Sequence, residues 1–146
     1  MKYLFSSIAL VILMLFSCNK PSHIQHTDTT SIEGKWRMIT VQDVSSGLIT
    51  TKPSAIQGDV DITFTSEGTN GTFIGNTPTN TIGQNEYSIG TNQAMSIPNL
   101  SMTKVMETTW GDEFVKNIRD TREYNFYTDG RLNIKTTNTI LTFRKL

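Results

Sequence analysis

Apolar side chains alternate with polar ones in several short stretches of this sequence, and this pattern restricts the possible folds more than any other feature. Val60, Ile62 and Phe64 alternate with polar residues, so they share one face of an extended chain. The alternation recurs later in the chain, at Tyr87/Ile89, Met95/Ile97, Leu132/Ile134 and Leu141/Phe143. Each of these stretches is predicted to be a half-buried β-strand.

Turn residues separate the predicted strands. The pairs Asn70-Gly71 and Asp129-Gly130 favour tight hairpins, and Thr and Asn outnumber Ala in this part of the chain. Strands joined by tight turns favour an antiparallel sheet that curls toward a barrel, because closure removes exposed edges. We therefore predict a mainly β (α+β) fold, with a small antiparallel β-barrel-like sheet.

One segment follows a helical period instead. Trp110, Phe114 and Ile118 recur at every fourth position, which places them on one face of an α-helix. Thr109 and Asp112 are a plausible capping pair at its start. The sequence predicts a single amphipathic helix that packs on the sheet.

The N-terminus has the layout of an export signal. Lys2 is followed by an unbroken apolar run over residues 8–16, which ends at the small residue Ser17 before Cys18. The run is shorter than the roughly 20 apolar residues that span a bilayer. Residues 1–17 are therefore predicted to be a signal peptide.

The stretch Leu15-Phe16-Ser17-Cys18 resembles the lipobox of bacterial lipoprotein precursors. The resemblance implies acylation of Cys18, with palmitate-type chains that hold the protein on a membrane of the cell envelope. An ordinary thiol at Cys18 and a retained membrane anchor are the alternatives. Because no acidic cluster follows Cys18, we expect the outer membrane, with the domain facing the periplasm.

Residues 18–32 comprise Cys18 and a polar segment that is predicted to be a flexible tether, and residues 33–146 form one domain. His23 and His26 in the tether have a spacing that would suit a metal only in a helix, so we predict solvated histidines and no metal site. Residues 28–30 resemble a short O-glycosylation motif of Bacteroidota.

Charge and composition argue against several functions. The chain has 13 basic and 13 acidic residues, so it has no net positive charge that would attract nucleic acid. The predicted domain contains neither His nor Cys, and we expect no enzyme and no cofactor. Asp59 with Asp61, and Asp112 with Glu113, are predicted to be solvated surface pairs rather than an acid and a base.

From residue 64 onward, the order of motifs resembles the META-domain (HslJ-like) family of small envelope proteins. The segments that carry it are FTSEGTNGTFIGN, NEYSIG, LSMTKVMETTWGDEFVKNI, EYNFYTDGRLNIK and ILTFRKL. In addition, Gly34-Lys35-Trp36 resembles the G-x-W opening of lipocalin-like barrels. The resemblance implies a compact antiparallel fold, often on a lipid anchor, and no catalytic residues.

Two functions fit these features. The first is a lipid-anchored interaction or structural module that binds an envelope protein, with polar loops such as residues 75–85 as contact surfaces. The alternative is a lipocalin-like carrier of a small hydrophobic ligand. Eight apolar residues would line or fill its cavity, and we favour filling: Trp36, Phe64, Phe73, Tyr87, Met95, Met102, Tyr124 and Phe126.

Overall fold

The computed structural model describes residues 31–146, which form one antiparallel β-sheet and one α-helix. The strands are β1 (Gly34–Asp43), β2 (Ile49–Thr51), β3 (Asp61–Glu67), β4 (Asn70–Asn76), β5 (Thr81–Ile89), β6 (Met95–Ser96), β7 (Thr121–Phe126), β8 (Leu132–Thr136) and β9 (Thr139–Lys145). The helix α1 (Thr109–Asn117) lies between β6 and β7, and the short 3-10 helices are η1 (Thr91–Gln93) and η2 (Ile118–Asp120).

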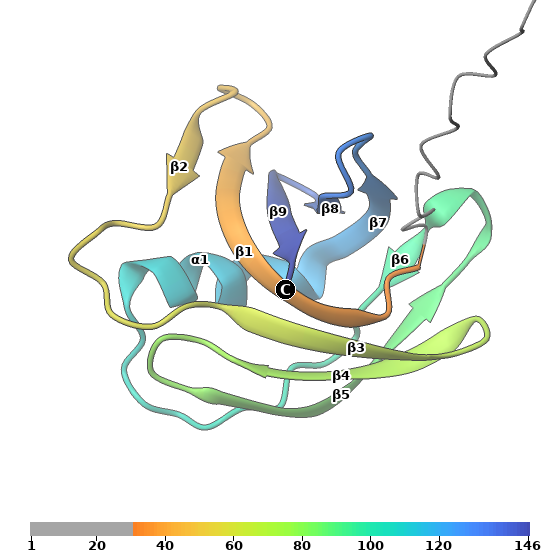
Figure 1. The fold of residues 1–146 in the computed structure, drawn as a ribbon, viewed down its shortest axis with the longest axis horizontal. Helices are drawn as coiled ribbons and strands as arrows, with labels where there is room; N and C mark the ends of the chain where they lie inside the picture. The colour runs from red at the N-terminus through yellow and green to blue at the C-terminus, as the bar shows by residue number, and fades with distance from the viewer. Residues whose placement is uncertain (1–30) are drawn as a thin grey trace, which may run out of the picture.

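The sheet curls into a nearly closed barrel (Figure 1). Its strands follow the order β6-β5-β4-β3-β1-β9-β8-β7, with β2 paired to β1 beside this path. The two ends of the sheet meet at an antiparallel bridge between Ala94, next to β6, and Glu123 on β7. The fold class predicted from strand alternation, a barrel-like antiparallel sheet with one helix, is confirmed.

The hairpin between β3 and β4 turns two residues earlier than the sequence suggested. Glu67 pairs with Asn70, so Gly68 and Thr69 form the turn, and Gly68 has a φ of +72°. The predicted turn at Asn70-Gly71 is therefore wrong, because both residues belong to β4. The register aligns Phe64 with Phe73 on the buried face.

Helix α1 buries the face that its period predicted. Trp110, Phe114 and Ile118 are almost completely buried in the core, Ile118 from the 3-10 turn that follows α1. The predicted cap is displaced by one residue: Gly111 N–H donates to the side chain of Thr108, at 3.1 Å. Thr109 is instead the first residue of the helix, so its hydroxyl does not accept this bond.

The first residues of the domain pack in the core next to the last strand, β9. Trp36 is fully buried, and its Nε1–H donates to the carbonyl oxygen of Ile32 at 2.7 Å. The ammonium of Lys145 lies 5.3 Å from the centre of the Trp36 ring, a cation–π distance. Ile32, which the sequence placed in the tether, is buried in the core, so the folded part includes it.

Several predictions concern residues outside the described part of the chain, namely the signal peptide, Cys18, His23, His26 and most of the tether. Of residues 31–146, no helical stretch has the length and apolar character that a bilayer crossing requires.

Candidate functional sites on the barrel surface and interior

The eight residues predicted to line or fill a cavity lie mostly in one core. Trp36, Phe64, Phe73, Tyr87 and Met95 are buried, and Tyr124 and Phe126 pack against them while partly exposed. Met102, on the segment after β6, is likewise partly buried against this core, where it bridges to Ile82 on β5. The structure thus brings all eight predicted residues together, five inside the core and three packed against it.

Aromatic rings occupy much of the space between the strands. The ring centre of Phe64 lies 5.1 Å from that of Tyr87, in an edge-to-face arrangement, and 5.6 Å from that of Phe73. At the other cluster, Phe126 lies 6.0 Å from Trp36 and 5.9 Å from Tyr124. These are ordinary distances for packed aromatic pairs, so the rings support the filled core that we favoured.

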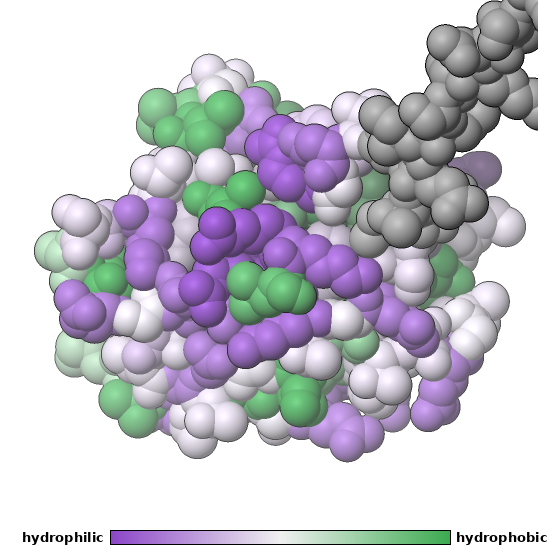
Figure 2. Space-filling model, viewed as in Figure 1, coloured by the Kyte–Doolittle hydropathy of each residue, from purple (hydrophilic) through white to green (hydrophobic). Residues whose placement is uncertain are grey.

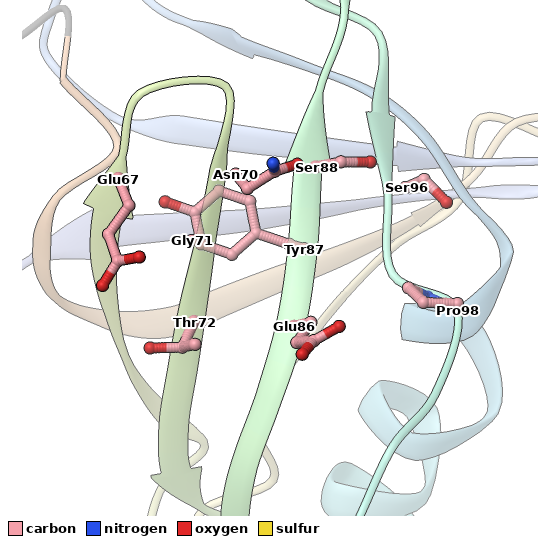
Figure 3. Close-up of a pocket in the computed structure, with 9 residues that line it drawn as sticks. All are labelled: Glu67, Asn70, Gly71, Thr72, Glu86, Tyr87, Ser88, Ser96 and Pro98. Atoms are coloured by element: carbon pink, nitrogen blue, oxygen red, sulfur yellow. The ribbon is translucent and has the colours of Figure 1, made fainter.

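A polar groove of about 380 Å³ lies over β4, β5 and β6 (Figure 3). Glu67 and Glu86 contribute carboxylates, and the ring of Tyr87 crosses β4 at Gly71 between them. The Tyr87 hydroxyl donates to the carbonyl oxygen of Thr65 at 3.4 Å, and burial raises the pKa of Tyr87. The groove can donate and accept hydrogen bonds, but none of its lining residues is a His, Cys or Lys that would assist catalysis.

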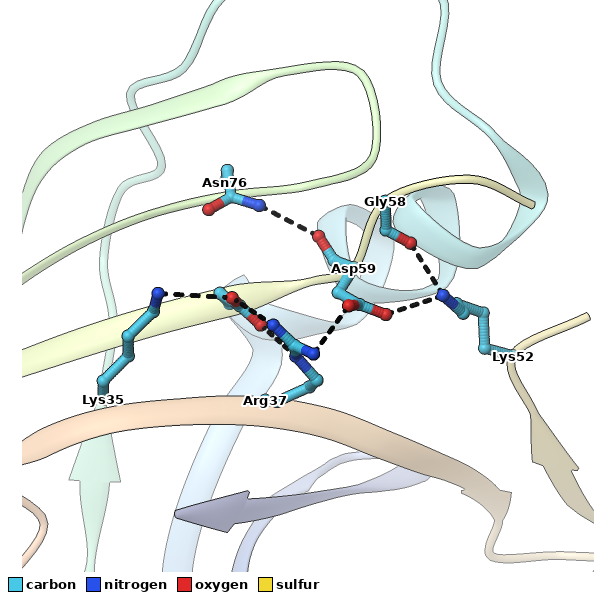
Figure 4. Close-up of polar contacts among 7 residues, drawn as sticks. Lys35, Arg37, Lys52, Gly58, Asp59 and Asn76 are labelled. Atoms are coloured by element: carbon cyan, nitrogen blue, oxygen red, sulfur yellow. Dashed lines mark hydrogen bonds and ion pairs between the residues drawn. The ribbon is translucent and has the colours of Figure 1, made fainter. Parts of the chain in front are cut away.

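A network of five charged side chains joins β1, β3 and the segment after β2 (Figure 4). Arg37 donates two hydrogen bonds to Asp61, at 2.7 and 2.9 Å, and its third nitrogen lies 2.8 Å from Asp59. Lys52 pairs with Asp59 at 2.7 Å, and Lys35 lies 3.5 Å from Asp61. The hydrogen bonds from Arg37 hold the pKa of Asp61 below its ordinary value.

The prediction that Asp59 and Asp61 are merely solvated is wrong for Asp61. Its exposed fraction is 5%, and its carboxylate needs Arg37 because a buried unpaired charge is costly. Both aspartates do share one side of the chain, as predicted, since Arg37 contacts both. Their role is to fasten the long connection after β2 to the barrel wall.

A second polar cluster surrounds Glu107, just before α1. Its carboxylate accepts hydrogen bonds from Thr77, from Thr79 at 2.8 Å, from Asn80 at 2.9 Å and from the N–H of Thr108 at 2.9 Å. Burial opposes ionisation here, but these donors outweigh it and lower the pKa of Glu107. The cluster ties the turn between β4 and β5 to the start of α1.

Two buried asparagines hold the segment after β6 against β5. Asn80 accepts from Val105 N–H at 2.7 Å and donates to the carbonyl oxygen of Val105 at 3.0 Å. Asn85 contacts Ser101 in the same way, with its Oδ1 accepting from Ser101 N–H at 2.5 Å and its Nδ2 donating to the Ser101 carbonyl at 3.2 Å. The two amides therefore extend the contact that the backbone bridge between Ile82 and Met102 makes along this stretch.

Sequence reasoning missed this role, because it treated residues 75–85 as a polar contact loop. Most of that range belongs to β4 and β5, and both Asn80 and Asn85 are buried. Asn side chains that bond nearby backbone are common in turns, so the run Thr77-Pro78-Thr79-Asn80 was a usable signal. The partner, Val105, is 25 positions away in the sequence and could not be inferred from it.

The hairpin of β1 and β2 extends beyond the barrel wall (Figure 1). It carries exposed apolar side chains. Val44, Leu48 and Ile49 have exposed fractions of 55%, 66% and 58%. Figure 2 shows hydrophobic surface over this hairpin, separate from the hydrophilic band across the middle of the same face. We call these three residues the hairpin patch.

Asp43 holds the hairpin turn in shape. One oxygen of its carboxylate accepts from Ser45 Oγ at 2.6 Å, from Ser46 N–H at 2.7 Å and from Ser46 Oγ at 2.9 Å. These bonds lower the pKa of Asp43 to about 2, so the carboxylate stays ionised at neutral pH. The hairpin patch is thus presented on an ordered turn.

Comparisons with known proteins support the fold alone. No family model matches this chain, and no curated protein matches it significantly. The NMR structure of a protein from Burkholderia xenovorans is similar to it, with a TM-score of 0.56 and 17% sequence identity over 78% of this chain and 82% of that chain. The resemblance to META-domain and lipocalin-like proteins stays a prediction.

Proposed function

We propose that this protein is a lipid-anchored interaction module of the cell envelope, held through Cys18, that binds a partner protein with its hairpin patch. The observation that carries the proposal is the exposure of Val44, Leu48 and Ile49 on one small hairpin, while most large apolar residues of the domain lie in its core. Neighbouring exposed apolar side chains are typical of surfaces that bind other proteins. Anchoring would raise the effective concentration of the module toward partners in the same layer.

The hairpin is suited to binding because little of it has to become ordered. Asp43 N–H donates to the Leu48 carbonyl at 2.9 Å, and Val44 N–H donates to the Asn138 carbonyl at 2.9 Å. In the described part of the chain, β2 pairs with β1 alone, so its other edge can accept a strand from a partner. A preformed surface reduces the entropic cost of association.

The test is site-specific photo-crosslinking in intact envelopes of the native cell. A photo-reactive amino acid at Leu48 is expected to give a reproducible protein adduct, and the same group at Gln84, an exposed residue of β5, is expected to give none. The double variant Val44→Asn, Ile49→Asn should reduce the Leu48 adduct at least fivefold. Equal adducts at both positions, or a Leu48 adduct unaffected by the double variant, would contradict the proposal.

The carrier function receives less support from the geometry, because aromatic rings occupy the core that a ligand would need. Tyr124 and Phe126 are nevertheless partly exposed beside Trp36, and they are the residues through which a small hydrophobic ligand would enter. Native mass spectrometry of protein purified from its own cells tests this alternative. A ligand that copurifies at constant stoichiometry would favour the carrier over the interaction module.

A further inference from the structure

A second cleft lies outside the barrel, between the segment of residues 100–107 and helix α1. It encloses about 480 Å³, within the range of roughly 300 to 1,000 Å³ that is usual for small-molecule sites. We call it the outer cleft. It is lined by Asn80, Leu100, Met102, Thr103, Lys104, Val105, Met106, Glu107, Val115 and Arg119.

Half of the lining residues are apolar, and two of these side chains are largely exposed. Met106 and Val105 have exposed fractions of 90% and 60%, and the floor is formed by the partly buried Leu100, Met102 and Val115. Exposed apolar side chains at a concave site favour an apolar ligand, because its binding removes them from water. The flexible Met side chains can adapt to an aliphatic chain.

The wall of the outer cleft is fixed by hydrogen bonds before any ligand binds. Asn80 contacts both backbone groups of Val105, and Thr103 N–H donates to the Thr81 carbonyl at 3.0 Å. In Figure 1 this segment passes along β5 on its way to α1. The backbone groups that a peptide strand would pair with at these two positions are therefore already used, which argues against strand addition here.

Two cations at the outer cleft have no counterion. Lys104 and Arg119 are exposed, and neither forms an ion pair or a side-chain hydrogen bond with any of residues 31–146. The one carboxylate in the lining, Glu107, is already bonded by Thr77, Thr79, Asn80 and the Thr108 N–H. The charge left for a ligand at the outer cleft is thus positive.

We propose that the outer cleft binds an amphipathic carboxylate, a single aliphatic chain that ends in a carboxyl group. The chain lies on Leu100, Met102 and Val115 under the side chain of Met106, and the carboxylate contacts Lys104 and Arg119. Arg recognises a carboxylate through two parallel N–H groups, and Lys adds a point charge. A concave site with two cations suits one small molecule better than the flat surface of a bilayer.

The experiment uses the full-length chain in phosphatidylcholine nanodiscs, with methionine methyl groups labelled with 13C and octanoate as the probe. Octanoate is expected to shift the methyl signals of Met102 and Met106 saturably. The signals of Met38 and Met95, which are buried in the core, should stay unchanged and report that the fold is intact. Octyltrimethylammonium, with the same chain and the opposite charge, should leave all four signals in place.

The matched variants separate this charge effect from a general loss of positive charge. Lys104→Gln with Arg119→Gln should weaken octanoate binding at least tenfold, whereas Lys116→Gln with Arg122→Gln removes two cations outside the lining and should leave it within twofold. Equal responses to octanoate and octyltrimethylammonium, or shifts at Met38 or Met95, would overturn the proposal. It would also be overturned if nanodiscs that contain phosphatidylglycerol shifted Met102 and Met106 without octanoate, because the cleft would then bind a lipid surface.

Discussion

The phenol ring of Tyr87 on β5 lies across β4 at Gly71, where the neighbouring strand has no side chain (Figure 3). A methyl group at Gly71 would lie 2.5 Å from the Tyr87 hydroxyl oxygen and 2.3 Å from the Thr65 carbonyl oxygen. Missing side-chain atoms on one strand thus make room for an aromatic ring from the next. The ring then reaches Phe64 in the core.

Gly71→Ala is expected to lower the free energy of unfolding by about 2 to 3 kcal/mol, because the added methyl overlaps backbone as well as the Tyr87 ring. Urea unfolding measures this change. Gly83→Ala is the matched control, since a methyl there would meet Ser101 no closer than 3.6 Å, and we expect a change within about 0.5 kcal/mol. Equal losses in the two variants would contradict the packing at Gly71.

Because Arg37 pairs with Asp61, the free energy of unfolding should decrease as the pH falls into the acid range. The folded-state pKa of Asp61 is lowered chiefly by the hydrogen bonds from Arg37, so its contribution is present above the unfolded-state pKa, near 4. That contribution is lost as pH falls through the lower folded-state pKa. Asp61→Asn should cost about 2 to 3 kcal/mol at pH 7 and flatten the decline of stability below pH 4.

Unfolding free energies measured in urea from pH 7 to pH 2 test this prediction. Asp112→Asn is the control, because Asp112 pairs with Lys116 on the exposed face of α1. We expect Asp112→Asn to change the free energy of unfolding by less than about 0.5 kcal/mol. An Asp61→Asn curve that runs parallel to the wild-type curve would show that Asp61 does not supply the acid dependence.

Glu107→Gln should loosen the segment before α1 without unfolding the barrel. The substitution replaces one acceptor oxygen by an NH2 group, which removes either the bonds from Thr77 and Asn80 or those from Thr79 and the Thr108 N–H, at a cost of about 1 to 3 kcal/mol. Hydrogen exchange followed by mass spectrometry should show faster exchange in residues 101–109. Glu86→Gln, on the exposed side of β5, should leave that exchange unchanged.

Trp110→Ala and Phe114→Ala should each lower the free energy of unfolding by about 3 to 5 kcal/mol, because both side chains are almost completely buried under the barrel. Thermal melting monitored by circular dichroism measures the loss. Lys116→Ala, on the exposed face of the same helix, controls for helix propensity. Unchanged melting in both core variants would rule out the packing of α1.

Cys18 is expected to carry the membrane anchor. Cys18→Ser should move the protein from the membrane fraction to the soluble fraction and abolish labelling with a palmitate analogue, since two or more acyl chains are needed for stable anchoring. Fractionation and mass spectrometry of protein from its native cells provide the measurement. A wild-type protein with an unmodified Cys18 would remove the basis of the envelope assignment.

The features that could be predicted from the sequence are those that follow from the spacing of apolar residues along one strand or one helix. Ile62 and Phe64 on β3, and Val60 just before it, alternate with polar residues and are all buried, because one face of a strand in a curled sheet points inward. Trp110 and Phe114 likewise lie on the buried face of α1, because residues four positions apart share a helix face. In both cases the information lies within a few consecutive residues.

Features that depend on distant partners could not be predicted. The hairpin turn lies at Gly68-Thr69 rather than Asn70-Gly71, because pairing of Phe64 with Phe73 and the room that Tyr87 needs at Gly71 fix the register. The outer cleft likewise arises from segments that meet only in the folded barrel.

The pairing of β1 with β9 joins the first and last strands of the barrel, and Leu146 N–H donates to the Lys35 carbonyl at 2.9 Å. The barrel therefore cannot close until the C-terminal residues have left the ribosome. Contacts between such distant parts of a chain form slowly. A polypeptide built in this way therefore completes its sheet only after its last strand is available.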